Sequence, residues 1–228
     1  MSGLWVLVLL IFVSSIPLIA VFIWFRFARY PFSIYRFLFA LLAGAAAVFP
    51  ALILQNFFFA PIPATGKWSL FFQIFISIAL TEELSRFLML FILFWISSRY
   101  AATGELQIQH GAASGLIAGF GFAVIEGAIY GASDTGVLLL RVFTAAPLHG
   151  ACGYRVGTAA VLFRSNPYQA IFRFLTATAI HGIYNFMIVM PGFPSFTAIL
   201  IALSALASSI LSIRNGWKNS DNQIQTTH

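Results

Sequence analysis

Two adjacent glutamates, Glu82 and Glu83, lie in the middle of an apolar segment that runs from Phe75 to Phe94, and Arg86 follows one helical turn later. An ionised side chain near the centre of a bilayer costs at least about 3 kcal/mol. The chain nevertheless places two of its six acidic residues there. Ionisable residues inside membrane spans mark functional sites by default, so this segment constrains both the fold and the function.

The composition predicts a membrane protein, because 61% of the residues are hydrophobic and only 8% are charged. A soluble domain carries about 25% charged residues. We therefore expect an all-α, polytopic transmembrane helical bundle in the cell membrane. Apolar segments of about 20 residues are long enough to cross a bilayer, and they predict seven spans at 4–25, 35–60, 69–98, 111–131, 137–163, 170–191 and 195–213. Residues 1–213 are expected to form one domain, and residues 214–228 a short, polar, disordered cytoplasmic tail.

Basic residues are unevenly distributed between the loops that join these spans. The loops on one side hold only Lys67, so the positive-inside rule places the other, crowded side in the cytoplasm and the N-terminus outside. Topology thus accounts for the net charge of +6, and the predicted partner is the lipid bilayer and not nucleic acid. The crowded side contains Arg26, Arg29, Arg36, Arg99, Arg164, Arg173, Arg214 and Lys218.

Polar residues from four predicted spans share one depth, from the middle of the membrane towards its outer face, when residues are counted at 1.5 Å of rise each. We expect these side chains to converge on one cavity. Arg86 is three residues from Glu83, on the same helical face, and is expected to form a structural ion pair with it. Arg141 lies near the outer end of its span and is expected to extend towards the surface. The residues at the shared depth are Glu82, Glu83, Glu126, His149, His181 and Asn185.

Small residues recur every four positions in two spans, a pattern that lets membrane helices approach closely. His149 belongs to one of these stripes, and Pro147 is expected to kink the helix just before it. One stripe contains Gly111, Gly115, Gly119, Ala123, Gly127 and Gly131, and the other contains Ala145, His149, Gly153 and Gly157.

Carboxylates and histidines in one cavity can activate water for hydrolysis. We predict that Glu82 is the general base, with Glu83 and Glu126 as the alternative candidates. His149 and His181 are expected to hold the water or the substrate carbonyl, and Asn185 to donate to the oxyanion. No HExxH motif is present, so we expect no cofactor, with zinc as the alternative because histidine and glutamate are common zinc ligands. A proton-coupled transporter or channel is the rival function, since it also needs intramembrane Glu, His and Arg.

Four features in order resemble the motifs of the PrsW family of intramembrane proteases, which is grouped with the CAAX prenyl endopeptidases and bacteriocin-processing proteases. They are the Glu82-Glu83-Leu84-Ser85-Arg86 run, the FxxxE of Phe122 to Glu126, His149 in PLHGACGYRVG, and the HxxxN of His181 to Asn185. The resemblance covers residues 80–190. Arg86 replaces the usual lysine of PrsW, and Asn185 replaces a common aspartate and matches the CAAX group instead.

The resemblance implies a single protease-like domain that cleaves membrane-anchored proteins, such as anti-sigma factors, with a glutamate as the base. The expected substrate is a single-span membrane protein. A CAAX-type prenyl-protein or bacteriocin-processing protease is the alternative within the same group. PrsW has also been described as a metalloprotease family, which leaves the role of a metal open.

Overall fold

The computed structural model describes residues 3–28, 30, 32–58, 66–96, 105–190, 192 and 195–226. Every regular element within these ranges is a helix, as the composition predicts. Two of the elements are π-helical, which is a form that often occurs at functional sites. The elements are α1 (Gly3–Ser14), α2 (Ile16–Phe27), α3 (Ile34–Ala46), α4 (Val48–Ile53), η1 (Leu54–Phe58), α5 (Lys67–Phe72), η2 (Gln73–Leu80), α6 (Thr81–Ile96), α7 (Glu105–Ser133), α8 (Thr135–Phe143), α9 (Ala145–Leu162), α10 (Pro167–Val189) and α11 (Ser195–Thr226).

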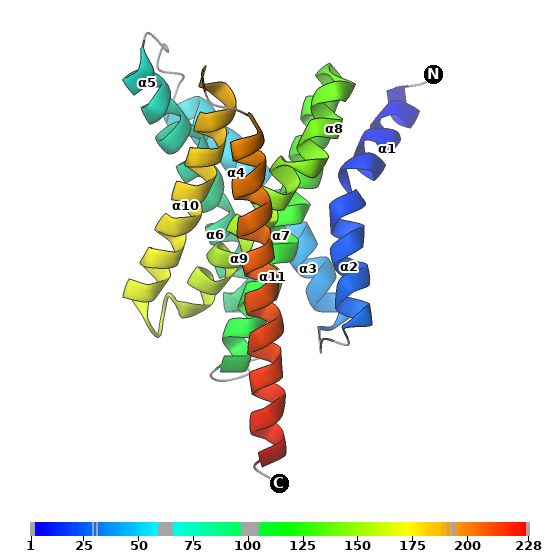
Figure 1. Cartoon of the computed structure of the whole chain (residues 1–228), viewed down its shortest axis with the longest axis vertical. Helices are drawn as coiled ribbons and strands as arrows, with labels where there is room; N and C mark the ends of the chain where they lie inside the picture. The colour runs from blue at the N-terminus through cyan, green and yellow to red at the C-terminus, as the bar shows by residue number, and fades with distance from the viewer. Residues whose placement is uncertain are drawn as a thin grey trace.

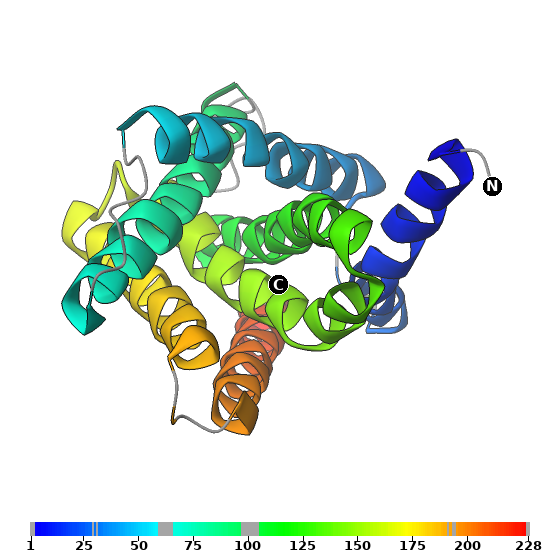
Figure 2. The same ribbon diagram turned by 90° about the horizontal axis from the view of Figure 1, so that it is seen from above.

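Helices α7 and α9 lie side by side at the centre of the bundle, and the other helices surround them (Figure 2). The glycine stripe causes this contact. A methyl group added at Gly115 would overlap the backbone carbonyl of Gly153, and one added at Gly119 would overlap the carbonyl of His149. Only glycine therefore lets the two backbones approach this closely, which confirms the packing role expected of both stripes.

Three long helical segments break shortly before a proline. The breaks lie at Ser15, Ala47 and Thr144, and Pro17, Pro50 and Pro147 follow within three residues. A proline ring clashes with the carbonyl of the residue four positions earlier. This explains why the expected kink near His149 lies upstream of Pro147, at Thr144, where α8 and α9 meet at 44°.

Three helical segments, Ile34–Phe57, Gln107–Ser133 and Phe196–Asn219, are long and apolar enough to cross a membrane. Two bent pairs, α1 with α2 and α8 with α9, would raise the number to five if each pair forms one span. The described residues thus form a helical membrane bundle. The count of seven spans stays a prediction, although helices occupy each of the seven expected positions.

The ends of the helices separate by charge. The C-terminal end of α2, the N-terminal end of α3, the turn between α9 and α10, and the C-terminal part of α11 lie at one end of the bundle, whereas α5 lies at the other (Figure 1). Arg26, Arg36, Arg164 and Arg214 belong to the first group of segments, and Lys67 begins α5. The cytoplasmic assignment of the basic end stays a prediction. Two of the arginines on which it was based, Arg29 and Arg99, lie outside the described residues. So do residues 59–60, 97–98 and 191 of three predicted spans and residues 227–228 of the predicted tail.

The expectation of a disordered tail after residue 213 is wrong, because α11 continues to Thr226. The first part of this continuation packs against the bundle through Trp217. Its side chain is buried, and it packs with Ile213 against residues of α2 and α7 in the largest apolar cluster. A large aromatic side chain held in this way anchors the helix beyond the apolar stretch.

Candidate active site

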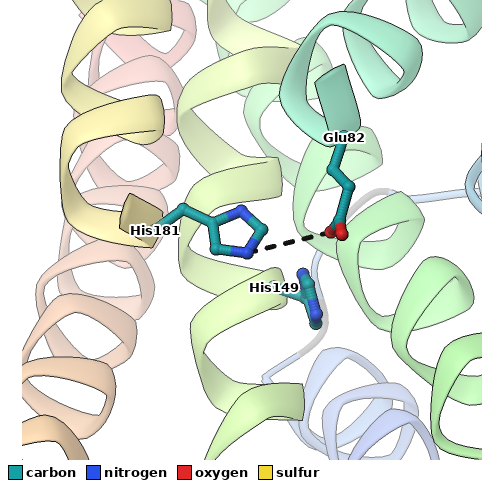
Figure 3. Close-up of side chains that lie close together, drawn as sticks. All are labelled: Glu82, His149 and His181. Carbon is teal, nitrogen blue, oxygen red and sulfur yellow. Dashed lines mark ion pairs between the residues drawn. The ribbon is translucent and has the colours of Figure 1, made fainter. Parts of the chain in front are cut away.

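Three buried side chains from three helices face one another inside the bundle: Glu82 from α6, His149 from α9 and His181 from α10 (Figure 3). His181 Nε2 lies 3.8 Å from Glu82 Oε2. One potential metal-binding atom from each of the three residues lies within 4.8 Å of the other two. The two imidazole rings meet edge to face, with their centroids 5.1 Å apart.

A second glutamate contacts the ring nitrogen of His181 that does not face Glu82. His181 Nδ1 lies 2.7 Å from Glu83 Oε1, and the same oxygen accepts a hydrogen bond of 2.6 Å from Arg86 Nη2. We call Arg86, Glu83 and His181 the Glu83 triad. The side chains of Arg86 and Glu83 are fully buried, and the guanidinium of Arg86 also covers the ring of Phe122 at 4.7 Å. A bonded arginine of this kind compensates a buried carboxylate that would otherwise be costly.

His149 is fixed in the same manner by Glu126. His149 Nε2 lies 2.7 Å from Glu126 Oε2, and Arg141 Nη2 from α8 lies 2.5 Å from that oxygen. We call Arg141, Glu126 and His149 the Glu126 triad. Four of the residues predicted to share a depth, Glu83, His181, Glu126 and His149, thus belong to two triads, with Arg86 and Arg141 as the third members. The expectation that Arg141 extends towards the surface is wrong, because its guanidinium turns inward to Glu126.

Asn185 stands apart from this network. It lies one helical turn beyond His181 on α10 and is half-buried. Among the described residues it takes part in none of the hydrogen bonds that join the two triads. Its amide is therefore available for another group near His181.

Sequence reasoning missed Gln55, a half-buried residue of the π-helical segment η1. Its Nε2 lies 3.3 Å from Thr81 Oγ1 and 3.4 Å from Glu82 Oε1. A polar amide in the apolar 35–60 segment was the available signal. Arg141 was noticed but misplaced, because its partner depends on the bend at Thr144, which the spacing of residues does not reveal.

The donor atoms fit a metal ion. In the described part of the chain, Glu82 Oε2 and His149 Nδ1 are buried and have no hydrogen-bond partner, and His181 Nε2 lies 3.8 Å from Glu82 Oε2. Two imidazole nitrogens and one carboxylate oxygen form a donor set typical of catalytic zinc, which keeps a fourth position open for water. The opposite nitrogen of each ring contacts a glutamate, as it does in most histidine-ligated metal sites. The donors, which lie within 4.8 Å of one another, are wider apart than the roughly 3.4 Å that bonds of about 2.0–2.1 Å would set.

The fold and the site define a helical membrane protein with a buried candidate metal centre of two histidines and one glutamate. The chain belongs to the PrsW family: the model described as "PrsW family intramembrane metalloprotease" matches residues 33–210. The protein is therefore an intramembrane protease. No curated protein and no solved structure matches the chain significantly.

The family match confirms the resemblance that the four motifs carried and extends it well beyond residues 80–190. It favours PrsW over the CAAX group, and a peptide hydrolase over a transporter. The expectation of no cofactor is corrected. The family is one of metalloproteases, and Glu82, His149 and His181 form a possible metal-binding group. The absence of HExxH misled the prediction, because these ligands come from three helices and need no local spacing.

Proposed function

We propose that the protein hydrolyses a peptide bond of a single-span membrane protein, at the point where Glu82, His149 and His181 meet. One observation carries this proposal: Glu82 Oε2 and His149 Nδ1 are buried, have no hydrogen-bond partner among the described residues, and face the ring of His181. Unpaired polar atoms in a protein interior are costly. Their convergence therefore indicates a site built for a ligand that the fold itself does not supply.

Glu82, His149 and His181 would hold the metal ion. When bound, zinc would supply Lewis-acid polarisation of the peptide carbonyl and activation of the attacking water. The two triads fix each imidazole with one nitrogen directed at the centre. Among Glu82, Glu83 and Glu126, only Glu82 has a carboxylate with no polar contact shorter than 3.4 Å to the described residues.

With Oε2 of Glu82 towards the metal, its other oxygen, Oε1, which lies 3.4 Å from Gln55 Nε2, would be the proton acceptor for water. Glu83 and Glu126 are less suited to this role, since each directs one oxygen to both an arginine and a histidine. A base must lie within hydrogen-bond reach of the proton it removes, and Glu82 faces the same centre as both histidines. Asn185, one turn along α10, would donate to the carbonyl oxygen as negative charge develops there. The proposed mechanism thus keeps Glu82 as the base, as the sequence predicts, and adds a metal ion at the same site.

The site also indicates where the substrate comes from. Glu82, His149 and His181 expose 5% or less of their surface, so the peptide bond has to enter the helical bundle. A membrane-anchored chain is already at this depth. Regulatory proteins with a single span, such as anti-sigma factors, are the substrate class that we propose on the strength of the motifs.

The test is cleavage of single-span reporter proteins by the purified chain in detergent. Glu82→Gln should abolish cleavage and leave the unfolding temperature close to that of the wild type. Asp134→Asn is the matched control, because Asp134 is an exposed helix cap that asparagine replaces well. A chelator should stop cleavage, and added zinc should restore it. Cleavage by Glu82→Gln at the wild-type rate would contradict the role of Glu82, and cleavage that persists after complete metal removal would contradict the metal.

A further inference from the structure

The two histidines of the site are supported alike, but only one of the two supporting arginines lies next to a motif glutamate in the sequence. Arg86 follows Glu83 on α6, whereas Arg141 lies on α8, 15 residues after Glu126. We infer that Arg141 is a positioning residue for the metal centre and that it acts on His149 through Glu126. This inference rests on the proposed function, because it concerns how His149 is held as a ligand.

The geometry of one oxygen atom carries the first step. Glu126 Oε2 lies 2.5 Å from Arg141 Nη2 and 2.7 Å from His149 Nε2. A carboxylate oxygen shared in this way is fixed from two directions, and the imidazole that donates to it is fixed as well. The nitrogen on the opposite side of the ring, Nδ1, is then directed towards Glu82 and His181. Partners of metal-bound histidines are known to set ring orientation and ligand strength.

The surroundings of Arg141 hold its guanidinium in place. The guanidinium stacks on the ring of Tyr130 at 4.1 Å, and Tyr130 lies one turn after Glu126 on α7. Helix α8 starts at a cap in which Asp134 Oδ1 accepts hydrogen bonds from the backbone N–H groups of Gly136 and Val137. The N-cap of α8 and the stacking on Tyr130 together hold the Arg141 side chain in one position.

The bend between α8 and α9 brings Arg141 to Glu126. The bend lies at Thr144, whose Oγ1 donates to the carbonyl of Leu140 at 2.9 Å and accepts from Tyr184 Oη at 2.8 Å. Tyr184 belongs to α10, three residues after His181. The bend that positions Arg141 is thus bonded to the helix that carries the other histidine.

A small cavity borders the Glu126 triad and separates it from α1. Its volume is about 10 Å³, and its lining includes Ser14, Glu126, Arg141 and His149. This is roughly the space of one water molecule. Ser14 Oγ and Arg141 Nε are buried and lack hydrogen-bond partners within the described ranges, so a water in this cavity would have two groups to bond. The cavity also gives the neighbouring side chains room to move if the Arg141 side chain is shortened. Replacing Arg141 should therefore change the position of His149 while the protein still folds.

The experiment measures the affinity for zinc alone, by competition with a chromophoric chelator, on the full chain in detergent. Arg141→Met and Glu126→Gln should each weaken zinc binding by about 10- to 100-fold. The double variant should be no weaker than the weaker single variant, because both changes interrupt the same chain of contacts. Arg155→Met is the control. Arg155 is also a half-buried arginine of the bent pair, but it bonds the carbonyl of Ala151 and the hydroxyl of Ser209, so it should bind zinc like the wild type.

A second readout separates positioning from simple stabilisation. The visible absorption spectrum of the cobalt(II)-loaded chain should change in Arg141→Met and stay unchanged in Arg155→Met, since only the first alters a ligand. Wild-type zinc affinity in folded Arg141→Met would overturn the inference, and so would losses that multiply in the double variant. If Arg141→Met does not fold, Arg141→Lys decides: about tenfold weaker binding supports the inference, and wild-type binding overturns it. A wild-type chain that binds no zinc would instead refute the metal centre itself, and the inference with it.

Discussion

The Glu83 triad and the Glu126 triad each hold one histidine ring in place, but they differ in how deeply they are buried. In the Glu83 triad the arginine and glutamate side chains are fully buried, and both come from one turn of α6. In the Glu126 triad the corresponding exposures are 21% and 15%, the three residues come from three helices, and a cavity lies beside them. The Coulomb attraction in a buried ion pair is less screened, but its loss leaves an isolated charge that is hard to hydrate. We therefore expect the Glu83 triad to contribute to stability as well as to function, and the Glu126 triad mainly to function.

The largest expected effect follows from removing either histidine, and it should be equal in the two triads. His149→Ala and His181→Ala should each lower the cleavage rate by about 10²- to 10⁴-fold and abolish tight zinc binding, because each removes one of three donors. Cleavage assays and zinc titration on the purified chains measure both effects. Zinc affinity that survives in one variant alone would break the symmetry and show that this histidine is not a ligand.

Replacing the arginine of each triad should show that the Glu83 triad contributes more to folding stability than the Glu126 triad does. Arg86→Ala leaves Glu83 as an unpaired buried charge and should cost about 3–5 kcal/mol of folding free energy. Arg141→Ala should cost less, because its partner borders a cavity and is partly exposed. Thermal unfolding and the yield of monodisperse protein compare the two. Arg86→Lys is the control, since lysine keeps the charge beside Glu83 and should restore most of the yield. An equal loss in Arg86→Ala and Arg141→Ala would refute the difference in burial as the cause.

The same contrast explains what the sequence could predict. The pairing of Arg86 with Glu83 depends only on a spacing of three residues in a helix, which is fixed by helical geometry. The shared depth of Glu82, His149 and His181 followed from counting along the spans. The contact of Arg141 with Glu126 depends instead on a bend at Thr144 and on how α8 crosses α7, and neither is encoded in a local spacing.

Other misses have the same origin. Gln55 reaches Glu82 from a π-helical segment, whose geometry does not follow from apolar periodicity. Zinc was given only as the alternative to no cofactor, because no local motif supported it, whereas the three possible donors come from separate helices. The helical bundle itself was predictable because apolar length alone determines it. The course of α11 past residue 213 was not, because it depends on one buried tryptophan.

Variants of Asn185 test whether this residue contributes to metal binding or to catalysis. It makes none of the triad contacts, so Asn185→Ala should leave zinc affinity and unfolding temperature unchanged. If it donates to the developing oxyanion, the cleavage rate should fall by about 10²- to 10³-fold. Asn185→Asp, the residue more common in PrsW proteins, is the informative companion. A change in zinc affinity without a change in rate would assign Asn185 to the metal centre instead.

The smallest effect concerns the hydrogen bond from Tyr184 Oη, on the helix that carries His181, to Thr144 Oγ1, at the bend between α8 and α9. Tyr184→Phe removes a buried donor and keeps the ring, so it should cost only about 1 kcal/mol of stability. Because this bond holds the bend that brings Arg141 to Glu126, the variant should also weaken zinc binding slightly. Tyr168→Phe, on the exposed face of the same helix, should change neither quantity. Combining Tyr184→Phe with Arg141→Met decides whether the bend acts through the Glu126 triad. If it does, the second change adds nothing to the zinc affinity already lost, and if the losses multiply, the bend supports His181 or the fold by another route.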